Sequence, residues 1–144
     1  MMTLSTRFLS ENPASVQDVW HARLWAVRPI AIALLGLFWF VTGVVSYTVG
    51  WDASLAIIRE SAAAAWAWPI VWFGALLDVV LGAALFVRAW TSRVAILMVI
   101  ATIGYLIAAT ILLPHYWGNP LGPWLKVLPM MALCLFVAGT EARR

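Results

Sequence analysis

The sequence predicts an all-α membrane protein: a four-transmembrane-helix bundle with an N-terminal interfacial helix and a short surface helix between the first two spans. Two observations predict this fold class. The 144-residue chain is 65% hydrophobic and only 10% charged, whereas soluble domains average about 45–50% apolar and about 25% charged residues. Four runs nearly free of charge are also each close to the roughly 17–25 residues that cross about 30 Å of hydrocarbon.

The four expected spans lie in a membrane domain of residues 28–144, at about 29–50, 69–87, 94–113 and 123–140. Three of them begin with a proline, which suits a first helical turn because that N–H would be unpaired anyway. Tryptophan is enriched at the headgroup level of a bilayer. The tryptophans near the run ends are Trp25, Trp51, Trp66, Trp68, Trp90, Trp117 and Trp124. Their placement favours the same four boundaries.

Residues 1–27 form the expected cytoplasmic tail, which carries an amphipathic helix at the membrane surface. Asn12 is a good N-cap, and Pro13 suits the first helical position. Apolar residues then recur at helical spacing up to Val27, and they include Trp20. Such a helix suits the membrane interface. Docking of a soluble partner is the alternative.

Two loops have more structure than a plain linker. Residues 51–68 are too polar to cross a membrane, but Asp52 is a potential N-cap, and Leu55, Ile58 and Ala62 share one helical face. We expect a short helix on the outer surface there. Residues 114–123 are rich in turn-forming and aromatic residues, which predicts an ordered cap over the outer end of the bundle.

The cations predict the orientation of the chain. One side of the membrane receives Arg7, Arg23, Arg28, Arg88, Arg93, Arg143 and Arg144. The other side receives only Arg59 and Lys126. Because short loops rich in Lys and Arg stay in the cytoplasm, seven cations against two predict that both termini are cytoplasmic.

Composition also excludes several functions. The net charge of +3 lies in short loops and forms no basic stripe for nucleic acid. Cys134 is the only cysteine, and neither His21 nor His115 lies in a span. No haem or metal site is therefore expected from this chain alone. The sequence has no glycine-rich phosphate loop and no Ser/His/Asp set, so catalysis by this chain alone is not expected.

Asp78 is the residue that most strongly suggests a functional site. It is the only charged residue in the middle of a span, where a carboxylate costs roughly 2.5 to 3.5 kcal/mol. The side chain is therefore expected to face the bundle interior, where it finds a partner or stays protonated. Gly74 and Gly82 share its helical face, which lets a neighbouring helix approach closely. A packing role and a role in ligand or proton handling remain equally open.

Tyr105 is the best partner for Asp78, because a buried phenol needs a hydrogen-bond partner. Threonine and serine in spans more often bond their own backbone. Lys126 is unusual in another way: it lies in the expected first turn of the fourth helix, where a cation opposes the helix dipole. It either extends to the outer headgroups or turns inward, to hold an anionic or carbonyl group or to pair with Asp78. The candidate pocket residues are Asp78, Lys126, Tyr105, Trp39, Ser46 and His115.

Several stretches resemble the DoxX-like family of small bacterial four-helix membrane proteins. The resemblance covers about residues 28–139 and rests on Arg28-Pro29, on Trp39, Thr42-Gly43 and Ser46, and on residues 77–82. Residues 119–129 are similar to the family signature Pro-Phe-Gly-Pro-Leu-Leu-Lys-Asn-Leu-Pro, with Leu121 in place of Phe and Val127 in place of Asn. The replacement by Val127 removes one polar group beside Lys126.

This resemblance implies an accessory part of a membrane redox system in the bacterial inner membrane. Some relatives are fused to a nucleotide-binding dehydrogenase-like domain, and distant ones belong to a thiosulfate:quinone oxidoreductase. The first hypothesis is therefore an accessory or anchor subunit of a quinone-linked complex. Its ligand would be a quinone or bound lipid, and its partners other membrane subunits and a soluble dehydrogenase-like protein on the cytoplasmic side. The alternatives are a purely structural or assembly subunit and a small proton-coupled transporter.

Overall fold

The computed structural model describes residues 16–118 and 125–141, and every regular element among them is helical. The chain forms two units, residues 1–30 and 31–144. An all-helical fold was expected, because backbone polar groups in lipid must be paired within each segment. The expected caps Asn12 and Pro13 lie outside the described residues.

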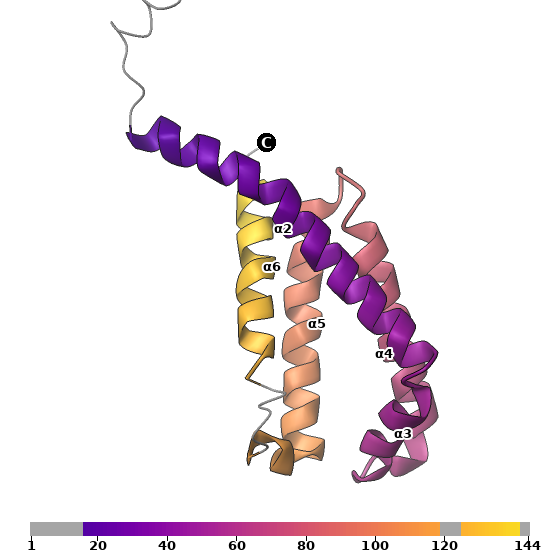
Figure 1. Ribbon diagram of the computed structural model, residues 1–144. Coiled ribbons are helices and arrows are strands. Elements are labelled where there is room, and N and C mark those ends of the chain that lie inside the picture. Colours follow the sequence, from indigo (N-terminus) through magenta and orange to yellow (C-terminus); the bar gives the residue numbers. More distant parts are fainter. Residues whose placement is uncertain (1–15, 119–124, 142–144) are drawn as a thin grey trace, which may run out of the picture. The chain divides into compact units, whose positions relative to one another are not determined.

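The first described helix, α2, spans Val16–Tyr47 and is continuous through Pro29 (Figure 1). The surface helix expected up to Val27 and the span expected from Pro29 therefore lie in one helix, and the boundary between the two units falls at residue 30. Proline removes one helical hydrogen bond, but neighbouring groups can compensate for such a loss in membrane helices. Apart from Arg28 the residues beside Pro29 are apolar and compatible with a helix, so one proline does not end it. A surface location for the part before Leu24 stays a prediction.

The remaining helices follow in short succession. They are α3 (Trp51–Arg59), the 3₁₀ turn η1 (Ala64–Trp66), α4 (Ala67–Ala84), α5 (Thr91–Leu112), the 3₁₀ turn η2 (Pro114–Gly118) and α6 (Val127–Glu141). The second and third expected spans are confirmed as helices, with ends within about three residues of those predicted. A short helix between the first two spans is also present as α3. Asp52 lies inside the first turn of α3, where Gly50 is the N-cap, so the expected cap role of Asp52 is wrong. An acid in that turn still favours the helix dipole.

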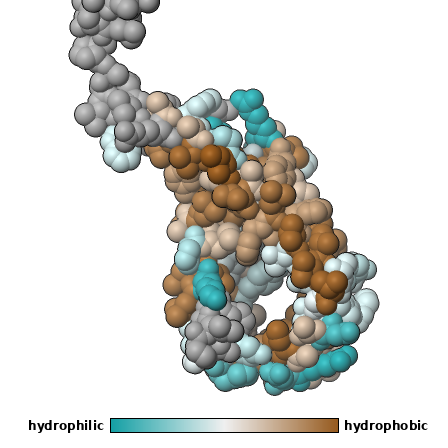
Figure 2. Space-filling view, viewed as in Figure 1, coloured by the Kyte–Doolittle hydropathy of each residue, from teal (hydrophilic) through white to brown (hydrophobic). Residues whose placement is uncertain are grey.

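Three helical segments are long and apolar enough to cross a membrane: Leu24–Tyr47, Ala64–Ala84 and Thr91–Leu112. In each, at most 28% of the most apolar stretch is buried inside the protein, so most of these apolar side chains face outward. In Figure 2 hydrophobic residues cover the middle of the helices, and hydrophilic residues gather at the end that holds α3. Such a surface suits lipid rather than water. The protein is thus a membrane protein.

The fourth expected span is only partly described. The apolar helix Val127–Thr140 is shorter than a typical span, and residues 123 and 124, where that span was expected to begin, lie outside the described residues. A fourth crossing therefore stays a prediction.

A dry core lies where α4 ends and α5 begins. Leu35, Leu85, Met98, Cys134 and Val137 are fully buried in it, and they come from α2, the end of α4, α5 and α6. Helices α5 and α6 lie side by side along this core (Figure 1). Ser92 ties them together by donating a hydrogen bond of 3.2 Å to the carbonyl oxygen of Ala138.

Helices α2 and α4 approach each other closely through glycines. A Cβ atom on Gly82 would lie 2.8 Å from Cα of Phe40 and 2.9 Å from the carbonyl oxygen of Gly36. A Cβ atom on Gly43 would lie 2.7 Å from the carbonyl oxygen of Ala75. Only glycine allows this backbone separation, as in other membrane helix pairs.

Candidate functional site: a cavity around Asp78

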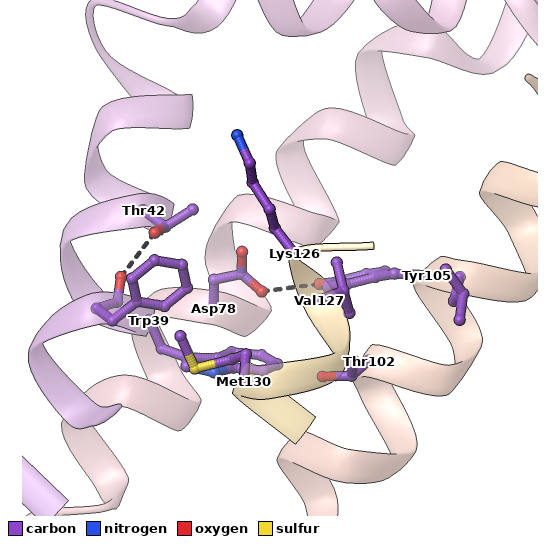
Figure 3. A pocket seen from close by; sticks show the side chains of 10 residues that line it. Trp39, Thr42, Asp78, Thr102, Tyr105, Lys126, Val127 and Met130 are labelled. Atoms are coloured by element: carbon purple, nitrogen blue, oxygen red, sulfur yellow. Dashed lines mark hydrogen bonds between the residues drawn. The ribbon is translucent and has the colours of Figure 1, made fainter. Parts of the chain in front are cut away.

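A cavity of about 300 Å³ lies between α2, α4, α5 and the start of α6. Its wall is mostly apolar, and a few polar side chains lie on it (Figure 3). The lining residues are Phe38, Trp39, Thr42, Asp78, Thr102, Tyr105, Leu106, Lys126, Val127 and Met130. Pockets of about 300–1,000 Å³ with apolar walls and a few placed polar groups are the usual sites for small molecules.

Asp78 and Tyr105 join α4 to α5 at this cavity. The Tyr105 hydroxyl donates a hydrogen bond of 2.9 Å to Oδ1 of Asp78, and it lies 3.3 Å from the carbonyl oxygen of Gly74 (Figure 3). Both residues are partly exposed at the cavity. The expected pairing of the interior acid with Tyr105 is therefore confirmed. A Cβ atom on Gly74 would lie 3.7 Å from the hydroxyl oxygen, an ordinary contact distance, so the phenol packs directly against this turn of α4.

The two cavity threonines bond their own helices. The Thr42 hydroxyl donates to the carbonyl oxygen of Phe38, and the Thr102 hydroxyl donates to that of Met98, each at 2.7 Å. This is the backbone bonding expected for threonine in a span. Their hydroxyl hydrogens are thus committed to the backbone, and only their oxygen lone pairs remain for a ligand.

Lys126 lines the cavity but makes no ion pair with Asp78, although both residues are described. It lies in a turn just before α6 and is exposed. The expected position inside the first helical turn is wrong, because α6 begins at Val127. In Figure 3 the Lys126 side chain extends away from Asp78. A cation at the rim is consequently placed to meet an anionic or carbonyl group of a ligand.

Trp39 closes part of the wall and is only 5% exposed. Its indole nitrogen is buried, and it has no hydrogen-bond partner among the described residues. Leaving a buried donor unpaired costs about 1–3 kcal/mol. The nitrogen is closed off from the cavity as well as from solvent, so Trp39 contributes its ring to the wall and not its N–H.

Four of the six residues expected in a pocket line this cavity, namely Asp78, Lys126, Tyr105 and Trp39. Ser46 is half-buried elsewhere on α2. His115 lies in η2, where its Nε2 atom is 3.8 Å from Oε2 of Glu60 and its ring contacts Tyr116. Neither Ser46 nor His115 lines the cavity.

The apolar wall was missed by sequence reasoning. Phe38, Leu106, Val127 and Met130 line the cavity, yet in sequence they are ordinary members of apolar runs. Met130 is the exception, because it follows Lys126 by four residues, and this helical spacing could have placed it on the same face as Lys126 and so in the cavity wall. Among the described residues, no group of three or more His, Cys, Asp or Glu side chains could hold a metal ion.

Fold and site together define a helical membrane protein with a small-molecule-sized cavity between its helices. The model of the DoxX-like family matches residues 36–135, which is well over half of the chain and includes most of the cavity lining. The chain therefore belongs to the DoxX-like family. No curated protein and no solved structure matches it.

Proposed function

We propose that this protein is an accessory or anchor subunit of a bacterial membrane redox complex, and that its cavity holds a quinone or a lipid. The cavity around Asp78 carries the proposal. Its volume of about 300 Å³ suits a single ring with part of an apolar tail. Phe38 and Trp39 offer aromatic surface to such a ring, and Asp78, Tyr105 and Lys126 offer polar contacts to its oxygen atoms.

The same proposal places the protein in the inner membrane with four crossings and both termini in the cytoplasm. The fourth crossing would combine α6 with the residues just before it. Support comes from the seven cations on one side of the predicted topology and the two on the other. A dehydrogenase-like partner would then meet the chain at the cytoplasmic side, and other membrane subunits would meet its exposed apolar helix faces.

Purification from native membranes in mild detergent tests the complex. We expect a dehydrogenase or cytochrome to co-purify in a fixed ratio. Repeated isolation of this chain alone, from membranes known to contain such enzymes, would count heavily against an accessory role.

Extraction of bound small molecules from the same preparation tests the cavity. Thr42→Leu adds apolar volume at the cavity wall, so we expect a co-purifying quinone or lipid to be lost. Thr48→Leu is the matched control, because Thr48 is also exposed, makes the same 2.7 Å bond to its own backbone and does not line the cavity. Equal ligand content in both variants would place any bound molecule elsewhere.

A structural or assembly subunit is the second candidate, and the hydrogen bond between Tyr105 and Asp78 favours it. This bond joins two spans and would stabilise the bundle without any ligand. Asp78→Asn keeps an acceptor for Tyr105 and should be tolerated under this reading. Loss of activity of the host complex in Asp78→Asn, with assembly intact, would exclude a purely structural role.

A further inference from the structure

The hydrogen-bonding groups of the cavity differ in whether they can still donate. The hydroxyl hydrogens of Tyr105, Thr102 and Thr42 are committed to Asp78, Met98 and Phe38 respectively. A hydroxyl has one hydrogen and two acceptor lone pairs, so all three present acceptors to the cavity. Oδ2 of Asp78 is a fourth acceptor, because only Oδ1 of that carboxyl has a hydrogen-bond partner among the described residues.

One donor remains on the cavity wall. The Lys126 ammonium has neither an ion pair nor a side-chain hydrogen bond within the described part of the chain, whereas the indole nitrogen of Trp39 is buried and out of a ligand's reach. A ligand oxygen that reaches both kinds of group must therefore donate to the acceptors around Asp78 and also accept from a donor. A hydroxyl does both, whereas a carbonyl oxygen only accepts.

We infer that the cavity binds the hydroxyl-bearing, reduced form of its ligand, a quinol, in preference to the oxidised quinone. This inference rests on the proposed function, and it adds which redox form the site selects. A quinol hydroxyl donates to Oδ2 of Asp78 and keeps its lone pairs for Lys126. A quinone carbonyl at the same place sets its lone pairs against those of Asp78, Tyr105 and Thr102 and leaves these acceptors unpaired. A hydrogen bond to a charged group is worth about 1.5–3 kcal/mol, so we expect roughly tenfold tighter binding of the quinol, or more.

Three related probes test this preference in the full-length protein in lipid nanodiscs. They are a short-tailed benzoquinone, the matching hydroquinone kept reduced under argon, and the dimethyl ether of that hydroquinone. The dimethyl ether has the ring and both oxygens but no hydrogen to donate. Calorimetric titration should show tight binding of the hydroquinone and weaker, similar binding of the other two.

Asp78→Asn supplies the decisive variant. The amide oxygen can keep the hydrogen bond from Tyr105, and the amide nitrogen then replaces Oδ2 with a donor of nearly the same size. The preference should be lost, because the amide N–H no longer accepts the hydroquinone's hydrogen and all three probes can accept from it. Asp52→Asn is the matched control, since Asp52 is exposed in α3 and does not line the cavity. That variant should keep the wild-type order.

The outcomes separate this inference from the proposed function. Equal binding of all three probes overturns the redox preference and leaves a quinone pocket intact. Tighter binding of the quinone by the wild type overturns it too, since Asp78 would then be a protonated donor. An unchanged order in a folded Asp78→Asn protein shows that Asp78 does not set the preference. Absence of binding for every probe overturns the pocket itself. The wild-type series needs no variant, so a misfolded Asp78→Asn protein does not prevent the test.

Discussion

The two halves of the bundle fill the space between the same helices in different ways. Beside the turn from α4 to α5, Leu35, Leu85 and Met98 are fully buried and leave a dry core. One or two turns further along α5, the side chains of Thr102 and Tyr105 line an open cavity instead. Large aliphatic side chains pack to crystal-like density. Thr102 is short and bonds its own helix, and Tyr105 extends to Asp78 on α4, so neither fills the space beside it as the aliphatic residues do.

The largest loss of stability should come from making a cavity in the closed half of the bundle, the core that contains Leu35, Leu85 and Met98. Met98→Ala removes a fully buried side chain from the core, and we expect a loss of about 2–5 kcal/mol of stability from lost burial and an unfilled cavity. Thermal melting in detergent measures it. Ile100→Ala on the same helix is the control, because Ile100 is 59% exposed and should lose much less. Similar losses in both variants would mean that the core is not closed as described.

A second experiment tests the glycine contact between α2 and α4. Gly82→Ala places a methyl group 2.8 Å from Cα of Phe40, so the two backbones must separate at a cost of about 1–3 kcal/mol. Gly104→Ala meets no atom within 4 Å and should be neutral, or stabilising by up to about 1 kcal/mol, because alanine favours a helix. If Gly82→Ala melts at the same temperature as Gly104→Ala or higher, the close approach of α2 and α4 does not require a glycine at position 82.

A smaller effect is expected in the open half. Tyr105→Phe removes the hydrogen bond to Asp78, and such bonds between membrane helices are worth about 0.6 kcal/mol on average. A double-mutant cycle with Asp78→Ala isolates the pairwise contribution. A coupling near zero would mean that the two residues are neighbours without a stabilising bond, and that the open half depends on apolar packing alone.

The helices and the partner of Asp78 were predictable from sequence, whereas the packing between the helices was not. Apolar runs predicted α2, α4 and α5, because a span must be apolar whatever its neighbours are. The pairing of Asp78 with Tyr105 was also predictable, since an interior acid needs a partner and few polar side chains were available. These features depend on residue type and position along one helix.

The unpredicted features depend on how helices rotate and where they end. Ser46 shares a helical stripe with Trp39, yet only Trp39 reaches the cavity. His115 lies near Glu60, the residue at the C-terminal end of α3. The two are 55 residues apart in sequence, so no local pattern predicts their contact. The start of α6 after Lys126 likewise depends on tertiary context, which overrides local propensity.

The smallest effect should appear outside both halves, where η2 meets the end of α3. The Tyr116 hydroxyl donates a hydrogen bond of 3.4 Å to Oε2 of Glu60. Partial desolvation, followed by the charge and the hydrogen bond of Glu60, raises the pKa of Tyr116 above its ordinary value of 10.0.

A raised pKa means that the folded protein holds this proton more tightly than the unfolded chain. The stabilising contribution of the proton is therefore complete below pH 10.0 and is lost as the pH rises through the folded-state pKa. Tyrosinate absorbance during alkaline titration should show a late contribution from Tyr116 that is missing in Tyr116→Phe and moves to lower pH in Glu60→Gln. A titration of Glu60→Gln identical to the wild type would show that Glu60 does not hold η2 to α3.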